Sequence, residues 1–269
     1  MGKRLGIICG AGDLPSQVCD EIRKKGLPCI IAAIKGHADP SLAEKADLFG
    51  SFGLDAFFDF MAFLKRNGVK EVVFAGKIDQ AVIYRKDKIA PAALELLKKG
   101  PDKGPESLIK TVIEFLESQG IAVLDPSSFL DKAFCEEGFL SSSKPARSIE
   151  PDIDFGWKIA RQAADLDIGQ TIVVKDRAVV AVEGMEGTDK AIERAGVLAG
   201  PGCTVVKVSR TDQDPRIDLP AVGLGTVKTM VAAGCAALCI EAGRMPFFQK
   251  EEAIALAGAH DIVILAKKA

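Results

Sequence analysis

Charged side chains of both signs occupy every second position along residues 210–218, in the order Arg210, Asp212, Asp214, Arg216 and Asp218. Carboxylate oxygens suit Mg²⁺, which characteristically takes one or two carboxylates together with substrate phosphates. An arginine can hold a phosphoryl oxygen through two hydrogen bonds. The segment 213–220, QDPRIDLP, therefore predicts phosphate chemistry, with Asp214 and Asp218 as metal ligands and one of them orienting or deprotonating water. The alternative is a salt-bridge cluster between domains.

A second candidate is the loop 183–189, EGMEGTD, which follows a predicted strand and opens onto a helix. Its glycines let backbone approach a ligand, and Thr188 is a natural N-cap. Acidic side chains beside an anion repel it unless a cation lies between, which again favours a divalent metal. The predicted substrate-binding residues here are Glu186, Gly187, Thr188 and Asp189, to which Arg216 of the later segment is added. The alternative is a capped turn without a ligand.

Near the N-terminus, GAGDLP lies between a predicted strand and a helix, where backbone amides can cradle a phosphate. Pro15 occupies the place of the third glycine of a dinucleotide fingerprint, and no acidic residue ends the second strand. These two departures argue against dinucleotide binding. A phosphate loop of another design, or a plain tight turn, remains. The candidate residues are Gly10, Ala11, Gly12, Leu14 and Pro15.

Lys77 follows Ala75 and Gly76 at the end of another predicted strand, on the same sheet edge as GAGDLP. Its ammonium could pair with a phosphate. A solvated lysine at a strand end is the equal alternative.

The first half of the chain alternates short apolar runs with amphipathic segments. Strands are predicted over 3–9, 28–34, 48–53, 69–74 and 121–124, and helices over 16–25, 55–67, 90–99 and 106–119. Repeated βα units of this kind imply a doubly wound parallel sheet. We therefore predict an α/β fold with a Rossmann-like N-terminal domain over residues 1–134.

Serine and proline then interrupt the pattern, and residues 135–150 are predicted to be a linker. A C-terminal domain over 151–269 follows, with a helix over 155–164, a hairpin of 171–174 and 178–182, a helix after EGTD at 186–189 and a helix over 226–233. The hairpin predicts a mixed α/β domain. At the start of this domain, Asp152 or Asp154 could cap the first helix or serve catalysis, with Trp157 in the core.

Composition narrows the function classes. A formal net charge of −2 with no basic block argues against nucleic-acid binding. The seven cysteines form no CxxC pair and lie in apolar surroundings, so they are predicted to be buried reduced thiols. Two histidines and scattered cysteines do not make a zinc site. No secretory or membrane-spanning segment stands out, which predicts a cytoplasmic protein.

These motifs carry a resemblance to a known family. GAGDLP, AGK at 75–77, PDIDFGW at 151–157, LDIGQTIVVKDRAVVAVEGMEGTD at 166–189 and QDPRIDLPAVG at 213–223 resemble the LpxI-type UDP-2,3-diacylglucosamine pyrophosphatases of Gram-negative bacteria. The resemblance covers nearly the whole chain. Its last three motifs are specific only when taken together.

The resemblance implies Mg²⁺-dependent hydrolysis of UDP-2,3-diacylglucosamine to UMP and 2,3-diacylglucosamine 1-phosphate (lipid X) for lipid A synthesis. It also implies a catalytic aspartate in the C-terminal domain, for which Asp218 is the first choice and Asp214 the second. Peripheral contact with the inner membrane follows from the location of the lipid-linked nucleotide-sugar substrate. Two alternatives stay open: a non-catalytic nucleotide-sugar or lipid sensor, and a nucleotidyl or sugar-phosphate transferase.

Overall fold

The computed structural model describes residues 4–78, 95, 105–141 and 149–269. These residues divide into two compact units. The first contains Met1–Leu130 and Asp214–Leu219, and the second contains Asp131–Gln213 and Pro220–Ala269. The predicted helix over 90–99 lies almost wholly outside the described residues.

The first unit is built on a five-stranded parallel sheet with the order β3-β2-β1-β4-β5. Its strands are β1 (Arg4–Cys9), β2 (Ile30–Ile34), β3 (Leu48–Phe52), β4 (Val69–Ala75) and β5 (Ala122–Leu124). β1 and β2 are buried almost throughout, as expected for central parallel strands, while the edge strand β3 is largely exposed. The predicted Rossmann-like sheet is confirmed.

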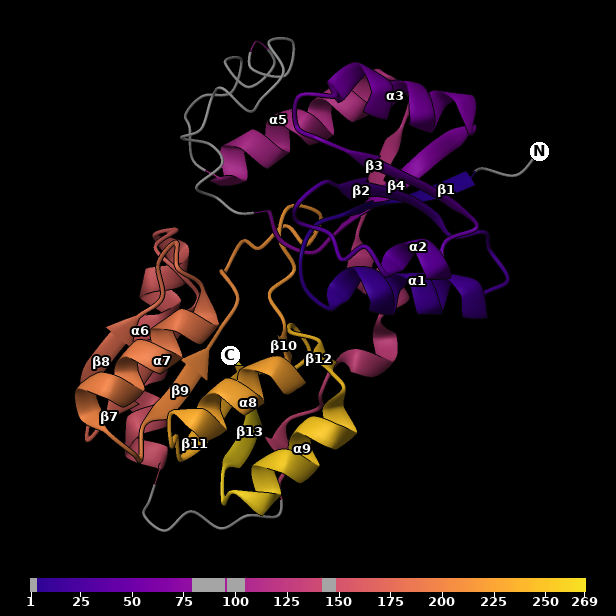
Figure 1. Cartoon of the computed structure of the whole chain (residues 1–269). Helices are drawn as coiled ribbons and strands as arrows, with labels where there is room; N and C mark the ends of the chain where they lie inside the picture. Colours follow the sequence, from indigo (N-terminus) through magenta and orange to yellow (C-terminus); the bar gives the residue numbers. More distant parts are fainter. Residues whose placement is uncertain (1–3, 79–94, 96–104, 142–148) are drawn as a thin grey trace. The chain divides into compact units, whose positions relative to one another are not determined.

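Helices cover both faces of this sheet (Figure 1). They are α1 (Leu14–Lys24), α2 (Leu42–Lys45), α3 (Phe57–Arg66) and α5 (Pro105–Ser118), followed by the 3-10 turns η3 (Pro126–Phe129) and η4 (Asp131–Ala133). Met61 and Leu64 of α3 and Ile113 and Leu116 of α5 pack on one face of the sheet. Ile217 packs against the same core, which explains why Asp214–Leu219 groups with the first unit.

The second unit contains a six-stranded mixed sheet with the order β6-β13-β11-β9-β7-β8. Its strands are β6 (Gly138–Phe139), β7 (Thr171–Lys175), β8 (Ala178–Val182), β9 (Thr204–Lys207), β11 (Ala237–Glu241) and β13 (Val263–Lys267). β9, β11 and β13 are parallel, whereas β6 and β7 run antiparallel to their neighbours. A short parallel pair, β10 (Val222–Gly223) with β12 (Phe247–Phe248), completes the unit. The predicted mixed domain with its β7–β8 hairpin is confirmed.

Two layers of helix enclose this sheet (Figure 1). α6 (Glu150–Asp165) packs on one face, and α7 (Thr188–Ala199), α8 (Leu224–Ala232) and α9 (Lys250–Ala259) pack on the other. Neighbouring residues of β9 divide between the layers, because Val205 belongs to the α7 side and Val206 to the α6 side. No helix in the described parts of the chain has the length and apolar character needed to cross a bilayer.

Two predicted boundaries differ from the structure. Residues 135–141 are not a linker, because Cys135 is in the core of the second unit and β6 pairs with β13. Residues 142–148 of that prediction lie outside the described residues. The segment Asp214–Leu219, assigned to the C-terminal domain from sequence order, groups with the first unit through Ile217.

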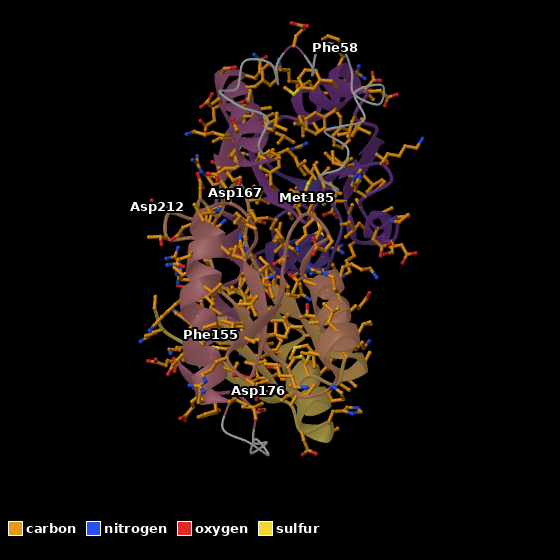
Figure 2. The ribbon with its side chains drawn as sticks, turned by 90° about the vertical axis from the view of Figure 1, so that its left-hand side faces the viewer. Phe58, Phe155, Asp167, Asp176, Met185 and Asp212 are labelled. Atoms are coloured by element: carbon orange, nitrogen blue, oxygen red, sulfur yellow. A yellow bond between two sulfur atoms is a disulfide. The ribbon has the colours of Figure 1, made fainter. Side chains whose placement is uncertain are left out.

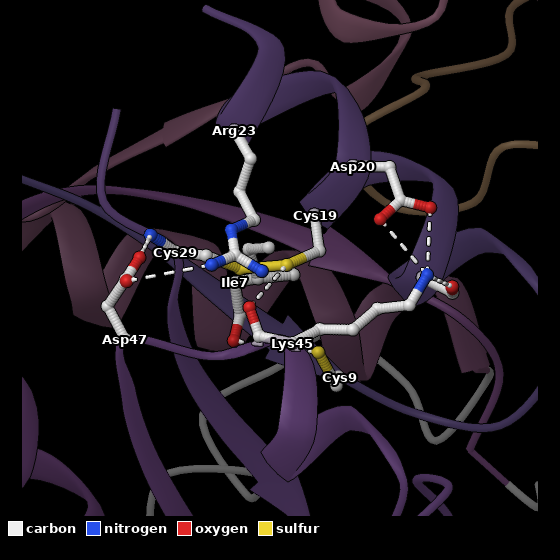
Figure 3. The surroundings of a disulfide bond; sticks show 9 residues. Ile7, Cys9, Cys19, Asp20, Arg23, Cys29, Lys45 and Asp47 are labelled. Atoms are coloured by element: carbon white, nitrogen blue, oxygen red, sulfur yellow. Dashed lines mark hydrogen bonds and ion pairs between the residues drawn. A yellow bond between two sulfur atoms is a disulfide. The ribbon is translucent and has the colours of Figure 1, made fainter. Parts of the chain in front are cut away.

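The prediction that all seven cysteines are reduced is wrong for one pair. Cys19 of α1 and Cys29, directly before β2, form a disulfide with Cα atoms 5.9 Å apart (Figure 3). The turn after α1 brings the two residues together, a proximity that their ten-residue spacing did not reveal. The other five cysteines are buried thiols, and burial raises the pKa of Cys9, Cys235 and Cys239 to about 12.

Candidate functional site

In the first unit, the loops after β1 and β4 meet where the strand order reverses. Chain order runs outward from β1 to β2 and β3 on one side, and β4 lies on the other side of β1. Crevices at the carboxyl ends of strands beside such a reversal are the usual ligand sites of doubly wound sheets. Both GAGDLP and AGK therefore lie at the position where this fold binds ligands.

Backbone hydrogen bonds tie these two loops together. Ala11 donates its N–H to the carbonyl of Lys77 (2.7 Å), and Lys77 donates back to Ala11 (2.9 Å). Gly10 donates to the carbonyl of Ala75 (2.8 Å). The structure thus brings Gly10, Ala11 and Lys77 together, as the shared sheet edge predicted.

Close backbone approach explains two glycines of this loop pair. A Cβ at Gly10 would lie 2.3 Å from the Lys77 carbonyl oxygen. A Cβ at Gly76, which has φ +87°, would lie 2.5 Å from the Ala11 oxygen. The helix α1 then begins at Leu14, with Pro15 in its first turn. Lys77 is exposed, as is Gly12.

In the second unit, β8 and β9 end at the same edge, because each runs antiparallel to β7 between them. The loop 183–189 leaves β8 there, and the chain leading to Asp214 leaves β9. Figure 2 shows Met185, Asp167 and Asp212 at this end of the second unit, with Asp176 of the hairpin turn at the opposite end. This edge therefore gathers both candidate loops at their starting points.

The loop 183–189 contains an exposed ion pair and a buried polar group. Arg194 donates to Glu186 at 2.7 Å. The backbone N–H of Glu186 and this arginine hold the pKa of the Glu186 carboxyl below its ordinary value. Asp189 is exposed and Thr188 is buried.

The predicted capping role of Thr188 is wrong. Gly187, with φ +84°, is the residue before α7, and no side chain caps this helix. The Thr188 hydroxyl donates instead to Glu183 at 2.8 Å.

The start of the other loop is held from the α6 side. Glu241, at the end of β11, is 1% exposed and accepts from Arg161 at 2.7 Å and from the backbone N–H of Ser209 at 2.8 Å. Arg161 also donates to the Ser209 carbonyl. These contacts fix the chain immediately after β9.

The same loop is also bound at its outer part. Asp165 accepts from the backbone N–H of Thr211 at 2.7 Å and from its hydroxyl at 2.9 Å. The Thr211 N–H is the largest cause of the lowered pKa of Asp165. Arg210 pairs with Asp167 at 3.1 Å, so this predicted charge is used within the unit.

The segment Asp214–Leu219 shows an ion pair in place of two separate ligands. Arg216 donates to both carboxylate oxygens of Asp214, through Nε at 3.1 and 3.2 Å and through Nη2 at 2.8 Å. This pairing is the largest cause of the lowered pKa of Asp214. Arg216 also lies 3.4 Å from Glu117 of α5. Asp214 and Arg216 thus form an ion pair within the first unit, whereas the predicted alternative was a cluster between domains.

Asp218 lies one turn beyond Asp214, and its backbone N–H donates to the Asp214 carbonyl at 3.3 Å. Its carboxylate is partly exposed. Within the parts of the chain that the structure describes, no group of three or more His, Cys, Asp or Glu side chains could hold a metal ion. The described residues therefore form no protein cage for Mg²⁺, whereas one carboxylate acting with substrate oxygens matches the coordination that Mg²⁺ usually takes.

The predicted capping of α6 by Asp152 or Asp154 is wrong. α6 begins at Glu150, earlier than predicted, and neither aspartate caps it. Asp152 is 1% exposed and accepts from the backbone N–H groups of Asp176 and Arg177 in the hairpin turn. Asp154 pairs with Lys267 at 2.6 Å.

Sequence reasoning missed the residues that hold the second edge: Asp165, Arg161, Glu241 and Lys207. The first two lie on one face of α6 and the last two end buried strands. A charged residue that closes an apolar strand was the available signal for Lys207 and Glu241.

The two units share a design typical of α/β proteins that bind small ligands, with loops and polar side chains at the carboxyl edge of a sheet. Comparison with known proteins defines the family. The model of the LpxI N-terminal domain matches residues 4–133, and that of the LpxI C-terminal domain matches 136–265. The chain belongs to the LpxI family.

One curated relative is UDP-2,3-diacylglucosamine pyrophosphatase LpxI of Caulobacter vibrioides. It is 29% identical over 276 residues, which cover 95% of this chain and 94% of the relative.

Solved structures show only weak likeness. L-threonine dehydrogenase from Phytophthora infestans has a TM-score of 0.29 at 15% identity, over 45% of this chain and 34% of the other. N5-carboxyaminoimidazole ribonucleotide synthetase from Thermus thermophilus has a TM-score of 0.23 at 14% identity, over 75% of this chain and 45% of the other.

Proposed function

We propose that this chain hydrolyses the pyrophosphate bond of UDP-2,3-diacylglucosamine, giving UMP and 2,3-diacylglucosamine 1-phosphate for lipid A biosynthesis. The observation that carries the proposal is that both LpxI domain models match, in order and almost end to end. The Caulobacter relative named for this activity aligns over nearly its full length.

We further propose that the reaction depends on Mg²⁺, with Asp218 supplying the protein's carboxylate and the substrate diphosphate supplying the other oxygens. Bound Mg²⁺ would neutralise charge on the diphosphate. Asp214 is the second candidate, and both of its oxygens accept from Arg216. Its role in the proposal is to hold Arg216 and the turn that carries Asp218.

The glycine-rich loops are proposed to bind substrate. The 10–15 and 75–77 loops present a backbone surface and Lys77, while residues 186–189 open α7, whose N-terminal amides favour an anion. Peripheral contact with the inner membrane is proposed from the acyl chains of the substrate alone.

Release of UMP from UDP-2,3-diacylglucosamine tests the proposal directly. Wild-type protein with Mg²⁺ should form UMP, and EDTA should abolish it. Absence of UMP under both conditions would favour the sensor alternative, and UMP transfer to an added acceptor would favour a transferase.

The two aspartates can be separated in the same assay. Asp218→Ala should lower kcat at least ~100-fold, the scale of losing a positioned acid–base group. Asp214→Ala should cost less, because it frees Arg216 without removing the proposed ligand. Wild-type turnover by Asp218→Ala would exclude Asp218 from the chemistry, and a larger loss in Asp214→Ala would reverse the assignment.

A further inference from the structure

A buried polar relay lies at the second unit's loop edge. Lys207 is 4% exposed, Thr188 is 6% exposed and Glu183 is 8% exposed. Lys207 Nζ donates to Thr188 Oγ1 at 2.7 Å, and that hydroxyl donates to Glu183 at 2.8 Å. Opposite charges thus flank one hydroxyl inside the protein.

Strand register explains why these residues meet. Thr171 is the cross-strand partner of Lys207, and the N–H of Glu183 donates to the Thr171 carbonyl. Residues in such a row point to the same face of a sheet. That face is the α7 side, because Val173 and Val205, two positions away, pack in the core beneath α7. Thr188, the first residue of α7, covers the row.

The relay joins the starting points of both candidate loops. Glu183 is the first residue after β8 and begins the loop 183–189. Lys207 is the last residue of β9 and begins the chain toward Asp214. Thr188 opens α7, which no side chain caps. The Thr188 hydroxyl therefore links Glu183 and Lys207, the residues at which the two loops start, to the first residue of α7.

Stability alone does not account for buried charges in this place. Replacing a buried charge pair by apolar residues of similar size is often neutral or stabilising, whereas removing one partner is costly. The second unit has another buried carboxylate at the hairpin end, that of Asp152, which accepts from the backbone N–H groups of Asp176 and Arg177. The relay is at the opposite end, where the proposed substrate loop begins.

We infer that Lys207 and Glu183 are positioning residues that act through Thr188 to set the 183–189 loop for substrate binding. The inference rests on the proposed hydrolase function. The loop contacts substrate equally in the ground and transition states, so disturbing the relay raises KM and leaves kcat nearly unchanged.

Three variants test the inference in the full-length protein. Thr188→Val removes the hydroxyl at nearly constant shape and should raise KM for UDP-2,3-diacylglucosamine about tenfold, which is ~1.4 kcal/mol of binding. Thr188→Ser should restore it. Glu183→Gln combined with Lys207→Met removes both charges together, so it should fold and show the same rise in KM.

Asp152→Asn is the matched control. It removes the charge of a buried carboxylate at the hairpin turn of the same unit, and it should lower Tm while KM and kcat stay unchanged. Amide hydrogen exchange gives a readout that needs no catalysis: Thr188→Val should speed exchange at 184–189 and 208–211 together, and Asp152→Asn only at 175–178.

The outcomes separate the two proposals. Unchanged KM and unchanged exchange in Thr188→Val would overturn the relay while leaving wild-type hydrolysis intact. If Tm and kcat both fall while KM stays unchanged, the relay has only a structural role. If wild-type protein forms no UMP, the proposed function fails, and faster exchange at both loops would then still support the positional link.

Discussion

The two units hold their loop edges by different means. In the first unit, the loops after β1 and β4 are joined by backbone hydrogen bonds between Ala11 and Lys77, and glycines permit the approach. In the second unit, buried charged side chains hold the loops. Lys207 lies on one face of the sheet and the Arg161–Glu241 pair on the other. The first edge is therefore sensitive to added volume, and the second to uncompensated charge.

The difference has a consequence for function. A backbone-joined edge offers carbonyls and amides of fixed position, which suits recognition of a ligand by shape. At an edge held by buried charges, the loss of one charged side chain displaces the loop that it holds. We expect substitutions in the first unit to act mainly through packing, and those in the second through loop placement.

The largest effect should come from breaking the Arg161–Glu241 pair. Arg161→Met removes the nearer guanidinium from the buried Glu241 carboxylate and leaves only that of Arg244, at 3.9 Å. It should lower the free energy of unfolding by about 3–5 kcal/mol. Urea denaturation measures the change. Combining Arg161→Met with Glu241→Gln should recover part of the loss. If the double variant is no more stable than the single one, buried charge is not what holds this edge.

Removing the Cys19–Cys29 disulfide should rank second. The bond ties α1, which follows the glycine loop, to the start of β2, and closes a ten-residue separation. Cys19→Ala with Cys29→Ala should cost about 2–3 kcal/mol through the entropy of the unfolded chain. Wild-type protein treated with a reductant should match the double variant in Tm, and equal Tm values for oxidised and reduced wild type would contradict the expectation.

The third-largest effect should come from adding one methyl group at the loop edge of the first unit. Gly10→Ala places a Cβ against the Lys77 carbonyl and should cost about 1–3 kcal/mol, as overpacking does. Gly225→Ala is the control, because nothing lies within 4 Å of a Cβ there and the site is in the first turn of α8. Thermal unfolding of both compares them. Equal Tm values would show that the two loops separate easily and are not a fixed pair.

Particular residues show how much of the fold and of the candidate site could be predicted from the sequence. The apolar runs of β1, β2 and β4 and the glycines after them predicted the first sheet and the meeting of GAGDLP with AGK, because parallel strands place their carboxyl ends on one edge. The segment 213–220 was different. Its charges indicated metal ligands, yet Arg216 binds both oxygens of Asp214, and Ile217 packs in the core of the first unit.

The core partners of Ile217 are distant in sequence, and no local pattern encodes them. Lys207 reads as the polar end of a strand until strand register brings it to Thr188. Asp152 reads as a helix cap until the hairpin turn is seen to donate to it. The site's elements were predictable from periodicity, whereas its side-chain pairing depends on tertiary register.

Acid sensitivity should give the smallest effect and distinguish Asp165 from Asp214. Both carboxyls have pKa values lowered in the folded state, from the ordinary 3.8. Each therefore stabilises the fold fully above pH 3.8, and the contribution is lost as pH falls through the lowered value. The largest cause for Asp165 is a backbone N–H, and for Asp214 it is the Arg216 side chain.

Added salt should distinguish Asp214 from Asp165, because salt screens an exposed ion pair more than a hydrogen bond to the backbone. Asp165→Asn and Asp214→Asn should each flatten the fall in the free energy of unfolding below pH 4, by an amount below about 1 kcal/mol. In 0.5 M NaCl the difference between wild type and Asp214→Asn should shrink, while that for Asp165→Asn should persist. Equal salt dependence of the two variants would mean that Asp214 is held by its turn and not by Arg216, which would return Asp214 to the list of candidate metal ligands.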